Sequence, residues 1–445
     1  MEMKMENTPA EIIYDLKKFN IQQYLVSDSD SNSDSKCEKI QKKKYTQNGA
    51  EYWILKYNKA NLTTDEYGTY GLCRSIIVRD GKILSFAPPK SVPLDQNPDA
   101  NMMIDYAEDF IDGTMINLFY DEVKHEWEIA TRSTVGANMY FYLDRWNDYS
   151  DKHTDMDMDM DMDMDMGTKP TTESSMKKKK TFRDMFYEAC EVNNINIALL
   201  DKTYCYSLVV QHPENRIVVP VDYPKVFLIR AYKIDNEAYT VREVSPSMLM
   251  DGTSGFANTG IMYPGRYPVD SLENLSGYFN GEQTPYYLVG IMVYSKTGAR
   301  GKIRNQNYER IRVLRGNQTK LLYHYLDLRK QGDGRVKQFL LFYPEFSRHF
   351  VEYRERVHEY TQTLYENYCK CFIKKAQKLK DYPPAYKVQM YKLHEHYLET
   401  LKGLGQYVNK RVVIDYFNGL EPAQQMYLLN FKYHTRGLEN DLEES

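Results

Sequence analysis

The densest group of residues that could do chemistry is a row of positive charges between positions 300 and 315. Six arginines and lysines fall within sixteen residues, Glu309 is the one acid among them, and Tyr308 lies in the middle. The six are Arg300, Lys302, Arg304, Arg310, Arg312 and Arg315. Guanidinium and ammonium groups bind phosphates, and a tyrosine ring can stack on a base. The row therefore predicts a surface for a phosphate-rich partner, unless half of its side chains are only solvated on a strand and its loop.

Seven short motifs, the last of them inside this row, follow one another along the chain. They are Cys73-Arg74-Ser75, Pro88-Pro89-Lys90, Phe110-Ile111-Asp112-Gly113, Thr131-Arg132-Ser133, Pro213-Glu214-Asn215-Arg216-Ile217-Val218, Leu288-Val289-Gly290 and Lys302-Ile303-Arg304. Their order and spacing, over about residues 50–318, resemble the nucleotidyltransferase core of the T4-type RNA ligases. The stretch that begins at Pro213 is the most specific single match, and the other motifs carry weight only together.

The departures from this family concern its catalytic groups. In the family, a lysine in K-x-D-G attacks the α-phosphate of ATP, and glutamates on later strands orient the ribose and hold a divalent metal. Here Phe110 stands at the lysine position, Val209 and Val289 stand at two glutamate positions, and no K-x-D-G occurs anywhere. The sequence therefore predicts a catalytically degenerate protein with no catalytic residue, metal site or cofactor. We expect the three apolar side chains to fill the former nucleotide pocket, because an unpaired buried charge there would be costly.

The resemblance also implies that the positive row lines a groove for a polynucleotide, so we expect RNA as the partner. The candidate RNA- or nucleotide-binding residues are Arg74, Lys90, Asp112, Arg132, Arg216, Lys302, Arg304, Tyr308, Arg310 and Arg312. Arg74, Lys90, Arg132 and Arg216 could equally be partners in structural ion pairs.

Two other functions stay open at this point. One is an active ATP-dependent RNA ligase or nucleotidyltransferase that requires ATP and Mg²⁺ and uses Lys90 or Lys302 as a non-standard nucleophile. The other is a viral structural or scaffold protein that captures a protein partner through its aromatic-rich helical part. A viral source is suggested because the segment 297–317 resembles uncharacterised proteins of giant DNA viruses.

The elements that must position these residues change in type along the chain. Strand patterns dominate up to about position 318, including a hairpin around Asp80-Gly81, two strands within 109–134, and strands at 203–211, 215–221, 225–234 and 286–295. A helix is expected over Phe182–Asn193. Helical spacing prevails further on, over 347–380, 385–404 and 422–433.

We therefore expect an α+β fold, with an antiparallel-sheet-rich nucleotidyltransferase core of ATP-grasp-like ligase adenylation type and an all-α C-terminal domain. The expected parts are an N-terminal helix (1–25), a disordered linker (26–46), the RNA-ligase-like domain (47–318) with a disordered insert (149–180), a helical domain (319–437) and a tail (438–445).

Charge and composition limit the partners further. Without the nine aspartates of the runs at 27–35 and 155–166 and the four lysines at 177–180, the net charge of −4 becomes +1, so the rest is close to neutral. Polyanion binding therefore needs a local basic surface. No apolar run is long enough for a membrane helix, and the six cysteines show no C-x-x-C spacing. We expect a protein of a reducing compartment, in the cytoplasm or a virion, without a membrane partner; the oligomeric state stays open.

Overall fold

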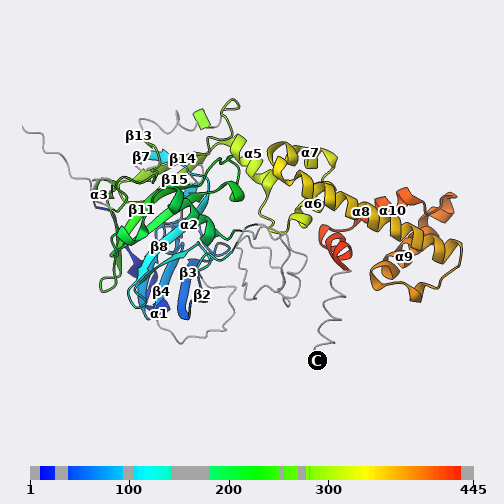
Figure 1. The fold of residues 1–445 in the computed structure, drawn as a ribbon, viewed down its shortest axis with the longest axis horizontal. Coiled ribbons are helices and arrows are strands. Elements are labelled where there is room, and N and C mark those ends of the chain that lie inside the picture. The colour runs from blue at the N-terminus through cyan, green and yellow to red at the C-terminus, as the bar shows by residue number, and fades with distance from the viewer. Residues whose placement is uncertain are drawn as a thin grey trace, which may run out of the picture. The chain divides into compact units, whose positions relative to one another are not determined.

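In the computed structural model, the described residues are 11–25, 39–93, 104–139, 141, 180–249, 255–268, 277–279 and 281–431. The chain divides into two compact units (Figure 1). We call residues 1–140 and 160–313 the core unit, and residues 141–159 and 314–445 the helical unit. Together they make an α+β protein with antiparallel sheets and a helical C-terminal region. The predicted insert lies outside the described residues except for Lys180, and so does the predicted tail.

The largest sheet of the core unit is antiparallel, with the order β1-β12-β11-β10-β8-β9. Its strands are β1 (Ile13–Asp15), β12 (Thr240–Glu243), β11 (Lys225–Asp235), β10 (Tyr204–Gln211), β8 (Thr114–Asp121) and β9 (Glu126–Ala130). The helix α2 (Phe182–Val192) packs against β10 and β11, and begins with a capping box between Thr181 and Asp184. The strands predicted at 203–211 and 225–234, the strands within 109–134 and the helix at 182–193 are therefore confirmed.

Two further sheets complete the core unit. One has the order β2-β3-β4-β5, with β2 (Ile40–Gln47), β3 (Ala50–Tyr57), β4 (Ile76–Arg79) and β5 (Lys82–Phe86). The other has the order β13-β7-β14-β15-β6, with β13 (Arg266–Tyr267), β7 (Ile104–Asp109), β14 (Gly290–Ser295), β15 (Arg300–Arg304) and β6 (Val92–Pro93). The predicted hairpin at Asp80-Gly81 joins β4 to β5, and both turn residues have positive φ, as a tight hairpin requires.

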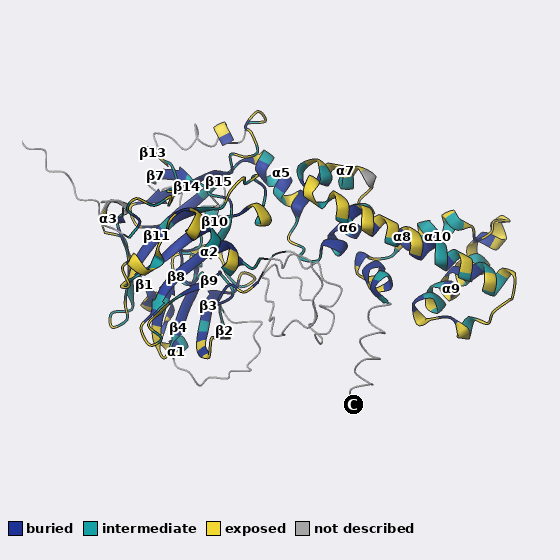
Figure 2. Ribbon diagram, viewed as in Figure 1, coloured by how far each residue is buried: buried dark blue, intermediate teal, exposed yellow. Residues whose placement is uncertain are grey.

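The main hydrophobic core lies where the four-stranded sheet meets the six-stranded one. Strand β5 contacts β8, β10 and β11, and the fully buried side chains there include Tyr52, Phe86, Phe119 and Tyr232. Figure 2 shows the strands of the core unit largely in the dark blue of buried residues. Phe86 and Tyr232 meet edge to face, with 5.1 Å between ring centroids, so large aromatics supply much of the packing.

Three local predictions were wrong. The N-terminal segment is not one helix: it forms β1, a 3-10 turn at Leu16–Phe19 and the short helix α1 (Gln22–Leu25). It extends the sheet because β1 pairs with β12, while its apolar side chains enter the main core. Residues 26–38 of the predicted disordered linker lie outside the described residues. The rest of the predicted linker is not disordered, because most of it belongs to β2. Its lysines suit an edge strand, where charged stems cover aromatic rings; Lys42 Nζ lies 4.4 Å from the centroid of the Trp53 ring.

The third wrong prediction is the strand at 215–221. This stretch forms a 3-10 turn at Pro213–Asn215 followed by bends, because its amide groups bind a side chain rather than a neighbouring strand. The predicted strand at 286–295 is confirmed only from Gly290 onward, as β14.

The helical unit consists of α6 (Leu321–Lys330), α7 (Asp333–Phe342), α8 (Ser347–Tyr368), α9 (Pro384–His396), α10 (Lys410–Gly419) and a helix over 422–431. The helix α5 (Gln306–Arg315) runs across the boundary between the units, and α3 (Pro246–Leu249) is a short turn of the core unit. Helix α8 packs against α6, α9 and α10. Stacked aromatics such as Phe339 and Phe350, with centroids 5.1 Å apart, fill the interior. In the described part of the chain, no helix combines the length and apolar character that a membrane span needs.

Candidate functional site

Positive side chains from separate segments of the core unit meet beside β15. We call them the cationic cluster: Arg74, Lys90, Arg132, Arg300, Lys302 and Arg304. Three of them lie at alternate positions of β15 and therefore share one face of that strand. Strand β6 lies parallel to β15, with Pro93 opposite Lys302. This pairing brings the segment that carries Lys90 next to the strand.

Backbone hydrogen bonds fix the Lys90 segment on both sides. Arg300 Nε donates to the carbonyl oxygen of Pro89 at 2.7 Å, and Lys90 N donates to the carbonyl oxygen of Gly71 at 2.8 Å. The second bond ties the segment to the loop that leads into Arg74. These contacts explain how residues more than 200 positions apart share one site.

Two tyrosine rings border the cluster. The ring of Tyr57 lies under two cations, with its centroid 5.2 Å from Arg132 Cζ and 5.9 Å from Lys90 Nζ. The ring of Tyr67 lies 5.1 Å from Lys90 Nζ. Such cation–π contacts hold the cations without neutralising them. The sequence did not single out either tyrosine, because nothing in their local spacing distinguishes them from the other tyrosines of the chain.

The electrostatics of the cluster show an excess of positive charge. Burial, and then the charges of Arg304 and Lys90, lower the pKa of Lys302 to about 8. Burial and the charge of Arg300 lower the pKa of Arg74 to about 9, and burial and Arg74 lower the pKa of Lys90. Among the described residues, no carboxylate lies within ion-pair distance of Arg74, Lys90 or Lys302. A bound anion would relieve this repulsion.

Asp112 lies in the turn before β8 and serves the fold. Its Oδ2 accepts hydrogen bonds from the amides of Val218 and Val219 at 3.0 and 3.1 Å, and its Oδ1 accepts one from Tyr308 Oη at 2.8 Å. Gly113 has φ +148°, and a Cβ there would stand 2.6 Å from the carbonyl oxygen of Val210, so the turn requires glycine. Both carboxylate oxygens are therefore occupied by groups of the protein itself.

These contacts give two of the predicted binding residues partners within the protein. Asp112 anchors the stretch after Pro213 and the helix α5, and is only 7% exposed. Tyr308 was expected to stack on a base, but it is 4% exposed and its hydroxyl is bound to Asp112. Burial and the Asp112 carboxylate raise the pKa of Tyr308, so it stays a neutral donor. Arg216 belongs to the same anchored stretch, where its Nε donates to the carbonyl oxygen of Val218 at 3.2 Å.

The three apolar replacements do not share one environment. Val209 and Val289 are buried, with 5% and 7% of their surface exposed. Phe110 is only half-buried, and Arg304 Cζ lies 5.0 Å from the centroid of its ring. Phe110, which the resemblance predicts at the family's lysine position, thus makes a cation–π contact with the cationic cluster.

The positive row from position 300 to 315 is a strand followed by a helix, not a strand and its loop. Arg310 is exposed on α5, where it bonds to Asn307 Oδ1 at 3.4 Å. Arg312 forms an ion pair with Glu309. Arg315 belongs to the helical unit, where its guanidinium lies 3.9 Å from the centroid of the Phe141 ring. Of the second half of the row, only Arg312 is thus tied to the cationic cluster, because its partner Glu309 also binds Arg304.

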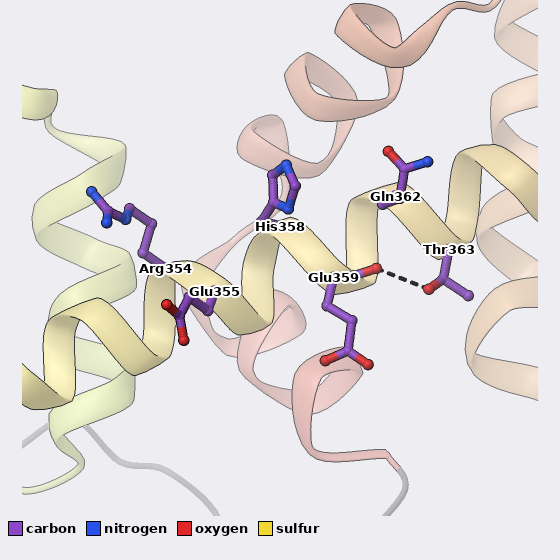
Figure 3. A pocket seen from close by; sticks show the side chains of 6 residues that line it. All are labelled: Arg354, Glu355, His358, Glu359, Gln362 and Thr363. Atoms are coloured by element: carbon purple, nitrogen blue, oxygen red, sulfur yellow. Dashed lines mark hydrogen bonds between the residues drawn. The ribbon is translucent and has the colours of Figure 1, made fainter.

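One hollow of about 410 Å³ lies in the helical unit, along α8 (Figure 3). Its lining residues are Arg354, Glu355, His358, Glu359, Gln362 and Thr363. They all come from one helix, and Thr363 Oγ1 is bonded to the carbonyl oxygen of Glu359 at 2.9 Å. The side chains do not converge on a common point, so the hollow suggests no chemistry. Across the described ranges, no group of three or more His, Cys, Asp or Glu side chains could hold a metal ion.

Comparison with known proteins connects the chain to viral proteins. An RNA ligase of Rhodothermus phage RM378 is 30% identical over 139 residues, which cover 31% of this chain and 25% of that ligase. This chain is a distant relative of a phage RNA ligase. The immediate-early protein ICP-46 homolog of Invertebrate iridescent virus 3 is 25% identical over 100 residues, or 22% of this chain and 23% of that protein. The chain thus spans about a quarter of the length of each relative. No protein-family model matches it.

Proposed function

We propose that this protein is a catalytically degenerate RNA-ligase-like protein that binds RNA phosphates through its cationic cluster. One observation carries the proposal: Arg74, Lys90 and Lys302 meet in the core unit without a carboxylate partner among the described residues. Keeping partly buried like charges together costs free energy unless an anion binds there. Phosphate contacts of this kind supply most of the affinity of proteins for nucleic acids.

Three features argue against ordinary ligation. Phe110 cannot form a phosphoramidate, and the buried Val209 and Val289 cannot hold a ribose or a metal. Asp112 is bound on both oxygens by the protein. Catalytic groups of one unit act together, so the loss of several removes most of the rate enhancement. We therefore assign the old nucleotide site a structural role.

One observation favours the rival function. Burial and neighbouring cations lower the pKa of Lys302 to about 8, so about a tenth of its amine is neutral at pH 7, against far less for an ordinary lysine. A neutral amine beside cations is the form in which lysine acts as a nucleophile. An active nucleotidyltransferase would attach a nucleotide there, with ATP and Mg²⁺ as cosubstrates. The proposed RNA-binding protein would not.

The test combines two measurements on one purified sample. First, the affinity for a labelled single-stranded RNA is titrated at two salt concentrations, for the natural protein and for Lys302→Gln and Lys90→Gln. Each substitution should weaken binding about threefold to tenfold and lower the salt slope by about 0.7, as expected for one lost phosphate contact. The matched control is Lys374→Gln, which removes an exposed lysine of the helical unit.

Second, the intact mass is measured after incubation with ATP and Mg²⁺. An unchanged mass together with salt-dependent RNA binding supports the proposal. A mass gain of one nucleotide, abolished by Lys302→Arg, would overturn the degenerate assignment. An absence of salt-dependent RNA binding would overturn the RNA assignment and favour a scaffold with a protein partner.

A further inference from the structure

Glu309 holds two arginines beside the cationic cluster. Its Oε1 accepts a hydrogen bond from Arg304 Nη1 at 2.6 Å, and its Oε2 lies 2.9 Å from Arg312 Nε and 2.7 Å from Arg312 Nη2. The three side chains are 26 to 34% exposed, so solvent and ligands can reach them. Glu309 is also the one acid in the row from 300 to 315. It therefore stands where it can compete with an anion.

The arrangement matches the way proteins bind a phosphate. Two guanidinium groups hold the two oxygens of one anionic group, and Arg312 approaches side-on through two nitrogens. Burial raises the pKa of Glu309, but the hydrogen bond from Arg312 and the charge of Arg304 outweigh this and keep the carboxyl ionised. Its negative charge also reaches Lys302. A phosphate that bound these arginines would have to displace the carboxylate.

We infer that Glu309 is an internal competitor that determines the specificity of the site, because it restricts phosphate contacts to Arg74, Lys90 and Lys302 and withholds Arg304 and Arg312 from the ligand. The inference rests on the proposed RNA binding. It adds that Glu309 determines how the affinity depends on the length of the RNA. A short oligonucleotide already uses the three available cations. A longer one gains no further contact unless the carboxylate is released.

The substitution Glu309→Gln tests this inference. It keeps the shape and one acceptor oxygen, but removes the charge that holds the arginines. We compare RNAs of about three and about twelve nucleotides, within the range of site sizes for single-strand binders. For the longer RNA, affinity should rise about threefold to tenfold, and the salt slope should steepen by about 1.4, for two added phosphate contacts. For the shorter RNA, the salt slope should stay unchanged, and the gain in affinity should be clearly smaller, because it reflects only the removed repulsion between Glu309 and phosphates near Lys302.

Two further variants separate the possible causes. Glu352→Gln removes an acid of the same charge, paired with Arg348 on α8, and should leave both affinities as they are. Arg312→Gln should have little effect in the natural protein, where Arg312 is held by Glu309, and should remove part of the gain in the Glu309→Gln background. Thermal melting of each variant checks that the fold is retained.

The outcomes distinguish the inference from the function on which it rests. If Glu309→Gln binds the longer RNA equally or more weakly, Glu309 braces the arginines for binding and the inference is overturned. If Glu352→Gln gives the same gain, the effect is one of overall charge and the inference is again overturned. If no variant binds RNA in a salt-dependent manner, the proposed function itself fails.

Discussion

The role of Asp112 allows a sharp prediction about the stability of the core unit. In Asp112→Ala, the amides of Val218 and Val219 and the hydroxyl of Tyr308 lose their acceptor inside the protein. Each buried donor left without an acceptor costs about 1–3 kcal/mol, because water cannot readily reach these groups to replace the carboxylate. We therefore expect a loss of about 3–5 kcal/mol in the free energy of unfolding. Asp112→Asn should cost about 1–2 kcal/mol, because it keeps one acceptor oxygen for the two amides, presents an NH2 group from which the Tyr308 hydroxyl can accept, and loses the charge.

Tyr308→Phe removes one of the three hydrogen bonds to Asp112. Its effect on the free energy of unfolding is a second test of the role of Asp112. It should cost about 1 kcal/mol on its own, and much less in the Asp112→Ala background, where its partner is already missing. A double-mutant cycle should thus return a coupling of about 1 kcal/mol between the two positions. A coupling near zero would show that the 2.8 Å contact between Tyr308 Oη and Asp112 Oδ1 contributes nothing to stability.

Urea unfolding measures the global effect, and hydrogen exchange measured by mass spectrometry locates it. Asp112→Ala should speed exchange in peptides that contain Val218 and Val219 and in peptides from α5, more than in peptides from β2 and β3. An unchanged urea midpoint and unchanged exchange would refute the structural role of Asp112. A loss of RNA binding without any loss of stability would instead make Asp112 a ligand-binding residue, as the sequence first indicated.

Three further predictions concern charge. Because burial and neighbouring cations lower the pKa of Lys302 to about 8, RNA affinity should fall as pH rises through that value. Lys302→Arg should remove this step in titrations at constant salt. Arg230→Met leaves the buried Glu108 and Glu243 without their shared guanidinium, which lies 2.9 and 2.8 Å from them, and should cost about 3–5 kcal/mol, visible as a lower melting temperature. An unchanged melting temperature would contradict this. Phe110→Lys should not restore nucleotide attachment, since the glutamates stay absent; an intact mass raised by one nucleotide would show otherwise.

Local sequence patterns predicted the elements in which apolar and polar residues alternate with a regular period. The hairpin of β4 and β5, the pair β8 and β9 and the helix α2 all follow from alternation, a turn sequence or helical spacing. The stretch after Pro213 was misjudged for the opposite reason. Its branched apolar residues suit a strand, but its amides bind the carboxylate of Asp112 from a hundred residues away, which no local pattern records.

The sequence by itself determined which chemical groups exist: no K-x-D-G motif occurs, valines lie at two positions where the resemblance to RNA ligases predicts glutamates, and one acid lies in a row of six cations. Such facts need no fold, because a missing group cannot be supplied by packing. Only the tertiary structure decided which groups act on one another. It left Lys302 beside other cations, paired Arg304 and Arg312 with Glu309, and buried Tyr308. The physical reason is that charge and hydrogen bonding act over a few ångströms in space, while some of the residues concerned are more than 200 positions apart in the chain.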